Sequence, residues 1–226
     1  EKSKEYDTVV RLKGGDVYVF GRGGEEGQAL YDAAVDFEVV PGLSSVMAGL
    51  AYAGIPITHR GLANSFCVYT GVLAKDTMRD FCFEEMLDDT RTYVFLMSMA
   101  RRNDIVNGLL AAGKDPSTPV AIVSKASMED QKVLVSTLDG VLEEFEKDPL
   151  ENPGIIVVGN VVTMQPVLNF YDKMRNRPKV LATMVGEDHY FTDHLPQCSV
   201  EEVITGNVRY LDADIPDLPK TFVFTS

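Results

Sequence analysis

The sequence has few cations for its length and no long apolar run. It contains 21 Lys and Arg residues against 34 Asp and Glu residues, which gives a formal net charge of −13. Nucleic-acid binding depends on neutralising phosphates, so we expect no nucleic-acid partner, and an acidic surface is also a poor match for anionic membranes. The uncharged stretch 44–58 contains two glycines and a proline and is too short to span a bilayer. We therefore expect no membrane partner either.

Cysteine is also scarce. Cys67, Cys82 and Cys198 are odd in number and far apart, and no CxxC pair occurs. The pattern therefore indicates neither a disulfide framework nor a zinc or redox centre. The first residues do not read as a secretory signal peptide. Together these observations predict a cytoplasmic protein.

Several catalytic motifs are missing as well. A GxGxxG motif starting at Gly21 fails because Glu26 stands where its last glycine is needed, and no phosphate-binding GxxxxGK[ST] loop is present. No GxSxG occurs, so a serine triad cannot be argued. His189 and His194 are five residues apart, which puts their rings on different faces of a helix. The sequence therefore predicts no metal site.

The first 57 residues alternate strand and helix patterns. Residues 8–13 and 37–40 are rich in branched apolar residues and predict strands, while residues 25–35 predict a helix. A second helix is expected from Ser44, which can cap its N-terminus, to Gly54, which suits the left-handed position after a helix. This order favours a parallel sheet covered by helices.

The polar stretch 58–65 predicts a domain boundary, and a mixed sheet with helices is expected beyond it. A helix with Ile105 and Leu109 on one face is expected to end at Gly113. A further junction is expected at 176–178, and the tail predicts a helix near 189–195. The predicted strands of these later regions are 66–70, 92–96, 120–123, 132–136, 154–158, 179–183 and 221–224.

The predicted fold class is thus α/β, with domains at 1–64, 65–175 and 176–226. Two parallel strands cannot bury two helices, so the first domain is expected to be a truncated parallel sheet. We expect the sequence to be a piece of a longer protein, cut through a domain at each end, or a joining of ordered pieces.

Ligands of open α/β sheets sit beyond the carboxyl ends of strands. Two loops of the first domain qualify, Gly14-Gly15-Asp16 and residues 41–45. Paired glycines allow close backbone approach, Asp16 can accept hydrogen bonds from a hydroxyl or amino group, and Ser44 and Ser45 open a helix whose free amides favour anions. Residues 97–98 and 124–126 are the matching positions of the second domain. The alternative is that GGD is only a tight turn and Ser44 only a helix cap.

The motifs at these loops resemble the tetrapyrrole methylase family, and within it the uroporphyrinogen-III C-methyltransferase branch. VRLKGGD at 10–16 and VFGRGGEE at 19–26 carry the likeness, which runs from about Tyr6 to Lys173. GRGGEE and GIPITHR are specific to this branch. The later matching blocks are FEVVPG at 37–42, AYAGIPITHR at 51–60, residues 65–71, TPVAIV at 118–123 and GIIVVGNVV at 154–162.

The resemblance implies a two-domain fold, a homodimer, and transfer of two methyl groups from S-adenosylmethionine to uroporphyrinogen III. The products would be precorrin-2, on the route to sirohaem and cobalamin, and S-adenosylhomocysteine. Arg22, His59 and Arg60 would bind the carboxylates of the substrate. The implied cofactor-binding residues are Gly14, Gly15, Asp16, Val19, Ser44, Ser45, Met97 and Ala126.

The sequence departs from the family pattern at several positions. Val17-Tyr18 replaces a usual Pro-Phe, Ser98 replaces a glycine, and residues 124–126 replace a usual Glu-Asn-Gly. The family's opening strand and the segment that holds its proton-transfer candidates are not in this sequence, so no catalytic residue is assigned. Two alternatives stay open: a methylase of another corrin precursor, and a non-catalytic module that binds a tetrapyrrole or nucleoside. The tail strands 179–183 and 222–226 resemble the start of uroporphyrinogen-III synthase.

Overall fold

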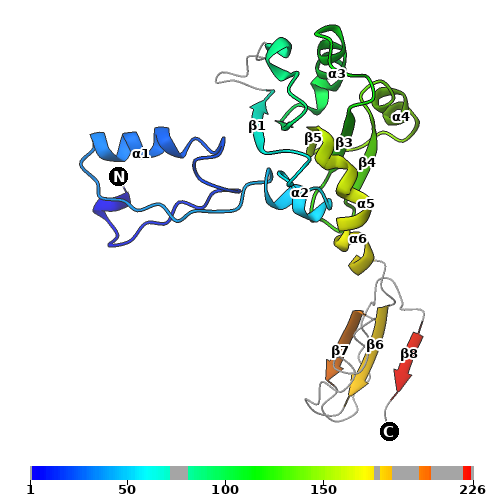
Figure 1. Ribbon diagram of the computed structural model, residues 1–226. Helices are drawn as coiled ribbons and strands as arrows, with labels where there is room; N and C mark the ends of the chain where they lie inside the picture. Colours follow the sequence, from blue (N-terminus) through cyan, green and yellow to red (C-terminus); the bar gives the residue numbers. More distant parts are fainter. Residues whose placement is uncertain (1, 72–80, 176–178, 185–198, 205–220, 225–226) are drawn as a thin grey trace. The chain divides into compact units, whose positions relative to one another are not determined.

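The computed structural model describes residues 2–71, 81–175, 179–184, 199–204 and 221–224 (Figure 1). The chain divides into two compact units, Glu1–Asn169 and Phe170–Ser226. No helix within the described residues is long and apolar enough to cross a membrane.

A five-stranded mixed sheet is the centre of the first unit. Its strand order is β1-β2-β5-β3-β4, in which β1 and β2 are parallel and every other neighbouring pair is antiparallel. All five strands predicted here from the sequence are confirmed, as is the mixed sheet. Their bounds are Ser65–Thr70 for β1, Arg91–Leu96 for β2, Pro119–Ser124 for β3, Lys132–Thr137 for β4 and Gly154–Val158 for β5.

Both faces of this sheet are buried, which explains why its central strands read as continuous apolar runs. Successive side chains of a strand point to opposite faces. On β2, Tyr93 and Phe95 belong to one core cluster and Val94 and Leu96 to the other. Because β2 is parallel in direction to β3, with antiparallel β5 between them, their carboxyl ends meet at the same edge of the sheet.

The helices α3, Arg102–Ala111, and α4, Val141–Lys147, cover the Tyr93 face (Figure 1). Ile105 and Leu109 of α3 are fully buried there, as the sequence predicted. Gly113 follows α3 with φ +96°, the left-handed conformation expected of a glycine after a helix.

The short helix α2, Ala48–Tyr52, covers the opposite face. Leu50 is fully buried among apolar side chains of β2, β3 and β5, and Ala63 joins the same cluster. The expected boundary at 64/65 therefore falls next to residues that share a core with the sheet. The described part of this unit also contains 3₁₀ helices and the short helix α5, Gln165–Leu168. The 3₁₀ helices are Lys2–Lys4, Phe83–Met86, Met99–Arg101 and Asn160–Met164.

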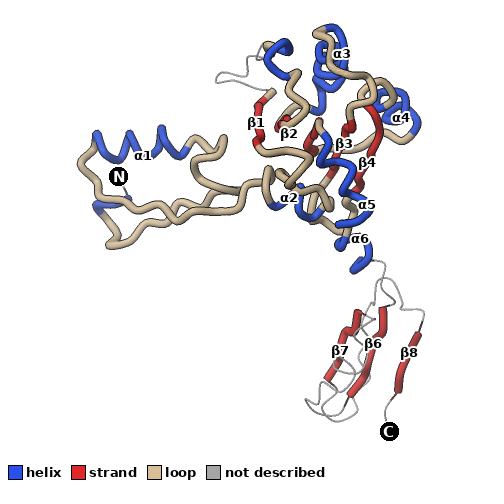
Figure 2. The backbone as a smooth tube through the Cα atoms, viewed as in Figure 1, coloured by secondary structure: helices blue, strands red, loops and turns tan. Residues whose placement is uncertain are grey.

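Residues 2–57 differ from the prediction. The helix α1, Gly23–Asp32, forms, but the predicted strands 8–13 and 37–40 are loops, drawn in tan in Figure 2. A strand is stabilised by backbone hydrogen bonds to a neighbour, and no such ladder joins these two segments. Leu12 stays 84% exposed. The parallel sheet expected for the first domain is therefore not formed within residues 2–57.

The second unit contains α6, Phe170–Arg175, and a three-stranded parallel sheet of order β7-β6-β8. Its strands are β6, Lys179–Met184, β7, Ser199–Ile204, and β8, Thr221–Phe224. The predicted strands 179–183 and 221–224 are thus confirmed, while the predicted helix near 189–195 lies outside the described residues.

Candidate functional site

A pocket of about 360 Å³ lies where the carboxyl ends of β2 and β3 meet the loops of the N-terminal region. Most of the side chains around it are small, so much of its wall is backbone. The lining residues are Gly14, Gly15, Asp16, Val19, Leu43, Ser44, Ser45, Ala48, Gly49, Leu96, Ala126 and Ser127.

Two glycine loops form one wall of the pocket by direct backbone contact. Gly15 has φ +87°, a conformation that side-chain-bearing residues rarely adopt. A Cβ added to Gly42 would lie 2.7 Å from the carbonyl oxygen of Gly15. Any larger residue at position 42 would therefore separate the loop 14–16 from the loop 42–45.

Asp16 joins these loops. Its Oδ1 accepts hydrogen bonds from the N–H groups of Tyr18, at 2.9 Å, and Val19, at 3.2 Å, and its Oδ2 accepts one from Gly42 N–H at 3.1 Å. These bonds, the one from Gly42 foremost, hold the pKa of Asp16 below its ordinary value of 3.8. A carboxylate offers about four acceptor positions, so Oδ2 keeps capacity for a ligand hydroxyl or amino group.

The segment leading into α2 forms the second wall. Ser44 Oγ accepts a hydrogen bond from Val46 N–H at 3.3 Å, and the Ser44 carbonyl accepts from Met47 and Ala48. Ser44 therefore starts the helical turns, as expected. However, the regular helix begins only at Ala48 and has five residues. The affinity for an anion expected at Ser44 and Ser45 stays a prediction.

The third wall is the loop after β3. A Cβ added to Gly49 of α2 would lie 3.2 Å from the Ala126 Cβ, so this loop packs closely on the helix. Lys125 and Ser127 both have positive φ, +48° and +67°. The Lys125 ammonium pairs with Asp130 at 2.6 Å and with Glu151 at 2.5 Å. These two carboxylates, Asp130 first, raise the pKa of Lys125 to about 12.

The structure thus gathers all but one of the predicted cofactor residues around one pocket. The exception is Met97, which follows Leu96 with φ +52° and is half-exposed, outside the lining. Leu43 lies in the predicted ligand loop 41–45 but was not assigned a role, and the sequence reasoning missed Ala48, Gly49, Leu96 and Ser127. A glycine inside a predicted helix, as at position 49, signals close packing and was the one usable hint.

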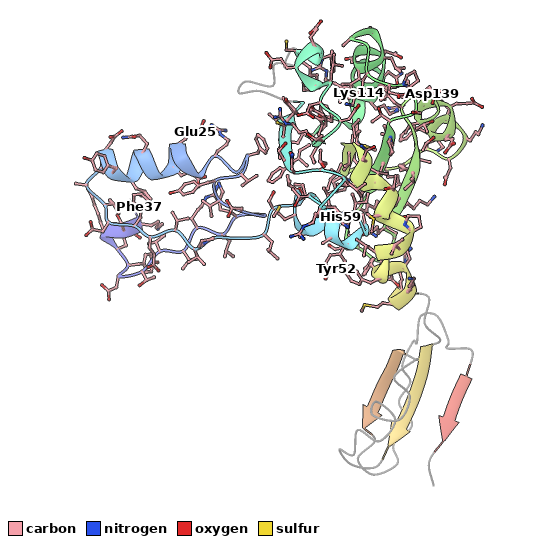
Figure 3. The ribbon with its side chains drawn as sticks, viewed as in Figure 1. Glu25, Phe37, Tyr52, His59, Lys114 and Asp139 are labelled. Atoms are coloured by element: carbon pink, nitrogen blue, oxygen red, sulfur yellow. The ribbon has the colours of Figure 1, made fainter. Side chains whose placement is uncertain are left out.

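The predicted substrate-binding cations do not line the pocket. Arg22 is exposed at the start of α1 and pairs with Glu25, Nε to Oε2, at 2.7 Å. His59, labelled in Figure 3 between α2 and β1, lies with Arg60 in an exposed turn closed by the His59 and Ala63 backbones. Arg60 forms no ion pair with any described residue.

No group of three or more His, Cys, Asp or Glu side chains suited to a metal ion occurs in the part of the chain that the structure describes. His189 and His194, which the sequence analysis considered as ligands, lie outside that part.

Curated proteins of similar sequence indicate which family this chain belongs to. The chain is 43% identical over 172 residues to a sirohaem synthase of Hahella chejuensis, covering 76% of this chain and 36% of that protein. It is 40% identical over 171 residues to an S-adenosyl-L-methionine-dependent uroporphyrinogen III methyltransferase of Methanosarcina barkeri, covering 74% of this chain and 66% of that protein. The chain thus spans about a third of the length of the sirohaem synthases that it matches.

Solved structures of methyltransferases are also similar to this chain. A uroporphyrin-III C-methyltransferase of Thermus thermophilus, complexed with S-adenyl homocysteine, is 38% identical with a TM-score of 0.62, covering 72% of this chain and 70% of that one. A cobalt precorrin-4 methyltransferase is 24% identical with a TM-score of 0.60, which concerns the fold alone.

The family match agrees with the resemblance found in the sequence motifs. Residues 1–142 match the family described as Tetrapyrrole (Corrin/Porphyrin) Methylases. That range includes both glycine loops, α2 and the strand ends that line the pocket. The chain belongs to the tetrapyrrole methylase family.

Proposed function

We propose that this chain takes part in the S-adenosylmethionine-dependent C-methylation of uroporphyrinogen III to precorrin-2. The observation that carries the proposal is the single pocket in which the glycine loops, Asp16 and the ends of β2 and β3 converge. The chain's family membership and its likeness to uroporphyrinogen III methyltransferases support the same reaction.

The pocket residues suit S-adenosylmethionine. A volume of about 360 Å³ falls within the range of small-molecule sites. Backbone groups at Gly14 and Gly15 can approach a nucleoside closely, and Asp16 Oδ2 can accept a hydrogen bond from a hydroxyl or amino group. When bound, this cofactor supplies an electrophilic methyl group. The chain's residues would hold the cofactor in position. Such positioning can lower the activation barrier of a reaction by roughly 7–11 kcal/mol.

Recognition of the substrate needs cations, because uroporphyrinogen III carries many carboxylates. We assign this role to Arg22, His59 and Arg60. Of the two arginines, Arg60 is the better candidate, since Glu25 already neutralises Arg22. Catalytic proton-transfer residues are not assigned.

Mass analysis of the products formed from S-adenosylmethionine and uroporphyrinogen III tests the reaction, with this sequence studied inside its full-length protein. A doubly methylated product is expected. Methylation only of another corrin precursor would favour the first alternative. Binding of S-adenosylhomocysteine or a tetrapyrrole without any methylation would favour a non-catalytic module.

The proposal extends to assembly and location. We infer a two-fold symmetric homodimer and a cytoplasmic protein, as expected from the family resemblance and the cysteine pattern. Sedimentation that finds only a 24.9 kDa monomer at micromolar concentration would contradict the dimer.

The domain limits 1–64, 65–175 and 176–226 also stay proposals. The parallel pairing of β6 with β8 supports a further α/β domain after residue 176, which we assign to the start of a uroporphyrinogen-III synthase.

A further inference from the structure

We propose that Gln131 is a positioning residue that joins two walls of the pocket and thereby sets its affinity for the cofactor. The inference rests on the proposed function, because it takes the pocket to be the S-adenosylmethionine site. Gln131 itself does not line the pocket.

Gln131 is a buried polar side chain with a bond to each wall. It is 2% exposed, at the end of the loop that follows β3. Its Oε1 accepts a hydrogen bond from Ser127 N–H at 2.7 Å, and its Nε2 donates to the Tyr52 carbonyl of α2 at 3.1 Å. One amide thus connects the wall made by Ala126 and Ser127 to the helix that carries Ala48 and Gly49.

Each bond is made to a backbone group of a pocket wall. Tyr52 is the last residue of α2, and the last carbonyls of a helix have no partner within it. Ser127 has φ +67°, which is unfavourable for a residue with a side chain. The bond from its N–H to Gln131 stabilises that conformation. Without the amide, Ser127 can relax and move the pocket wall away from α2.

A leucine at this position has similar bulk but neither hydrogen-bonding group. We expect Gln131→Leu to weaken S-adenosylhomocysteine binding by about tenfold, measured by calorimetry on the full-length protein that contains this sequence. Met128→Ala is the matched control, because Met128 belongs to the same loop but is 51% exposed, and its affinity should stay within twofold of the original. Urea unfolding of each variant separates loss of affinity from loss of folded protein.

Gln131→Glu gives a readout that a purely structural role would not move. The charged carboxylate can still accept from Ser127 N–H, but it cannot donate to the Tyr52 carbonyl. Burial raises the pKa of such a carboxyl, and its protonated form can donate again. The affinity deficit of this variant relative to the original chain should therefore shrink as the pH falls from about 8 to about 5.

Two results would overturn the inference: equal affinity of Gln131→Leu and the original chain, or a Gln131→Glu deficit that does not change with pH. If Gln131→Leu does not fold, the pH series of Gln131→Glu decides. If the full-length protein that contains the original sequence does not bind S-adenosylhomocysteine, the proposed function fails instead. Hydrogen exchange of residues 125–128 then tests the connection made by Gln131 independently of ligand binding. Faster exchange in Gln131→Leu than in Met128→Ala supports this connection, and equal exchange contradicts it.

Discussion

At the scale of single residues, Asp16 combines a structural and a proposed binding role. Its carboxylate accepts three backbone N–H groups from two loops, so it fixes the shape of the pocket wall before any ligand arrives. The remaining acceptor position at Oδ2 is the one available to a ligand. Removal of this side chain should therefore affect both the loops and the cofactor.

We expect Asp16→Ala to weaken S-adenosylhomocysteine binding at least tenfold, because a charge-assisted hydrogen bond and the contact with Gly42 N–H are lost together. Calorimetry on the full-length protein measures this change. Asp32→Ala is the control, since Asp32 accepts from Gln28 at the far end of α1 and is outside the pocket. Unchanged affinity of Asp16→Ala would remove Asp16 from the site.

The same carboxylate predicts a pH dependence of stability. Folding lowers the pKa of Asp16 below 3.8, so the folded state stabilises the ionised carboxylate of Asp16 more than the unfolded state does. Its contribution is fully present above pH 3.8 and is lost as the pH falls through the lower pKa of the folded chain. The difference in unfolding free energy between the original chain and Asp16→Ala should therefore shrink on acidification below about pH 4. An increase of this difference in unfolding free energy below about pH 4 would contradict the assignment.

At the scale of elements, the ends of α2 and α3 are built alike but surrounded differently. Each is followed by a glycine of positive φ, Gly54 at +77° and Gly113 at +96°. A Cβ on Gly54 would lie 2.7 Å from the Asn169 backbone, whereas a Cβ on Gly113 would meet nothing within 4 Å. The end of α2 is thus packed against the segment after α5, while the end of α3 is open.

We expect Gly113→Ala to cost about 1 kcal/mol of stability, from the left-handed backbone alone. Gly54→Ala should cost about 2–4 kcal/mol, since overpacking against Asn169 is added to the same backbone term. Urea unfolding of the two variants gives the comparison directly. Equal costs would mean that the α2 end can move away from Asn169.

At the scale of the whole molecule, the charge of −13 opposes the approach of a polyanionic substrate. Many described cations are already neutralised, such as Lys13 by Glu26 and Lys125 by Asp130 and Glu151. A local cation that pairs with no acidic side chain among the described residues, such as Arg60, then matters more than the overall field.

Arg60→Gln should therefore raise the Michaelis constant for uroporphyrinogen III in the full-length protein, with little change in that for S-adenosylmethionine. Lys147→Gln on α4 changes the net charge equally and serves as the control, because Lys147 pairs with Glu143 away from the pocket. If both variants have the same small effect, only the overall charge acts and Arg60 is not part of the substrate site.

The sequence by itself determined the strands of the central sheet, the covering helices α2 and α3, and the family, whereas α4 was not predicted. Segments such as 93–96 and 155–158 are apolar throughout, because both faces of the sheet are buried, and this local signal needs no knowledge of the partners. The GGD loop was predicted by the same kind of reasoning, from two glycines and an acidic residue at the end of a run rich in β-branched residues.

The tertiary structure decided what depended on distant partners. Residues 8–13 have the composition of a strand, but a strand also needs a neighbour to receive its hydrogen bonds, and composition carries no information about that neighbour. The exclusion of Met97 from the pocket and the bonds of Gln131 to Ser127 and Tyr52 depend on contacts between segments far apart in the chain. Such contacts are fixed only when the sheet, α2 and the loop after β3 are packed together.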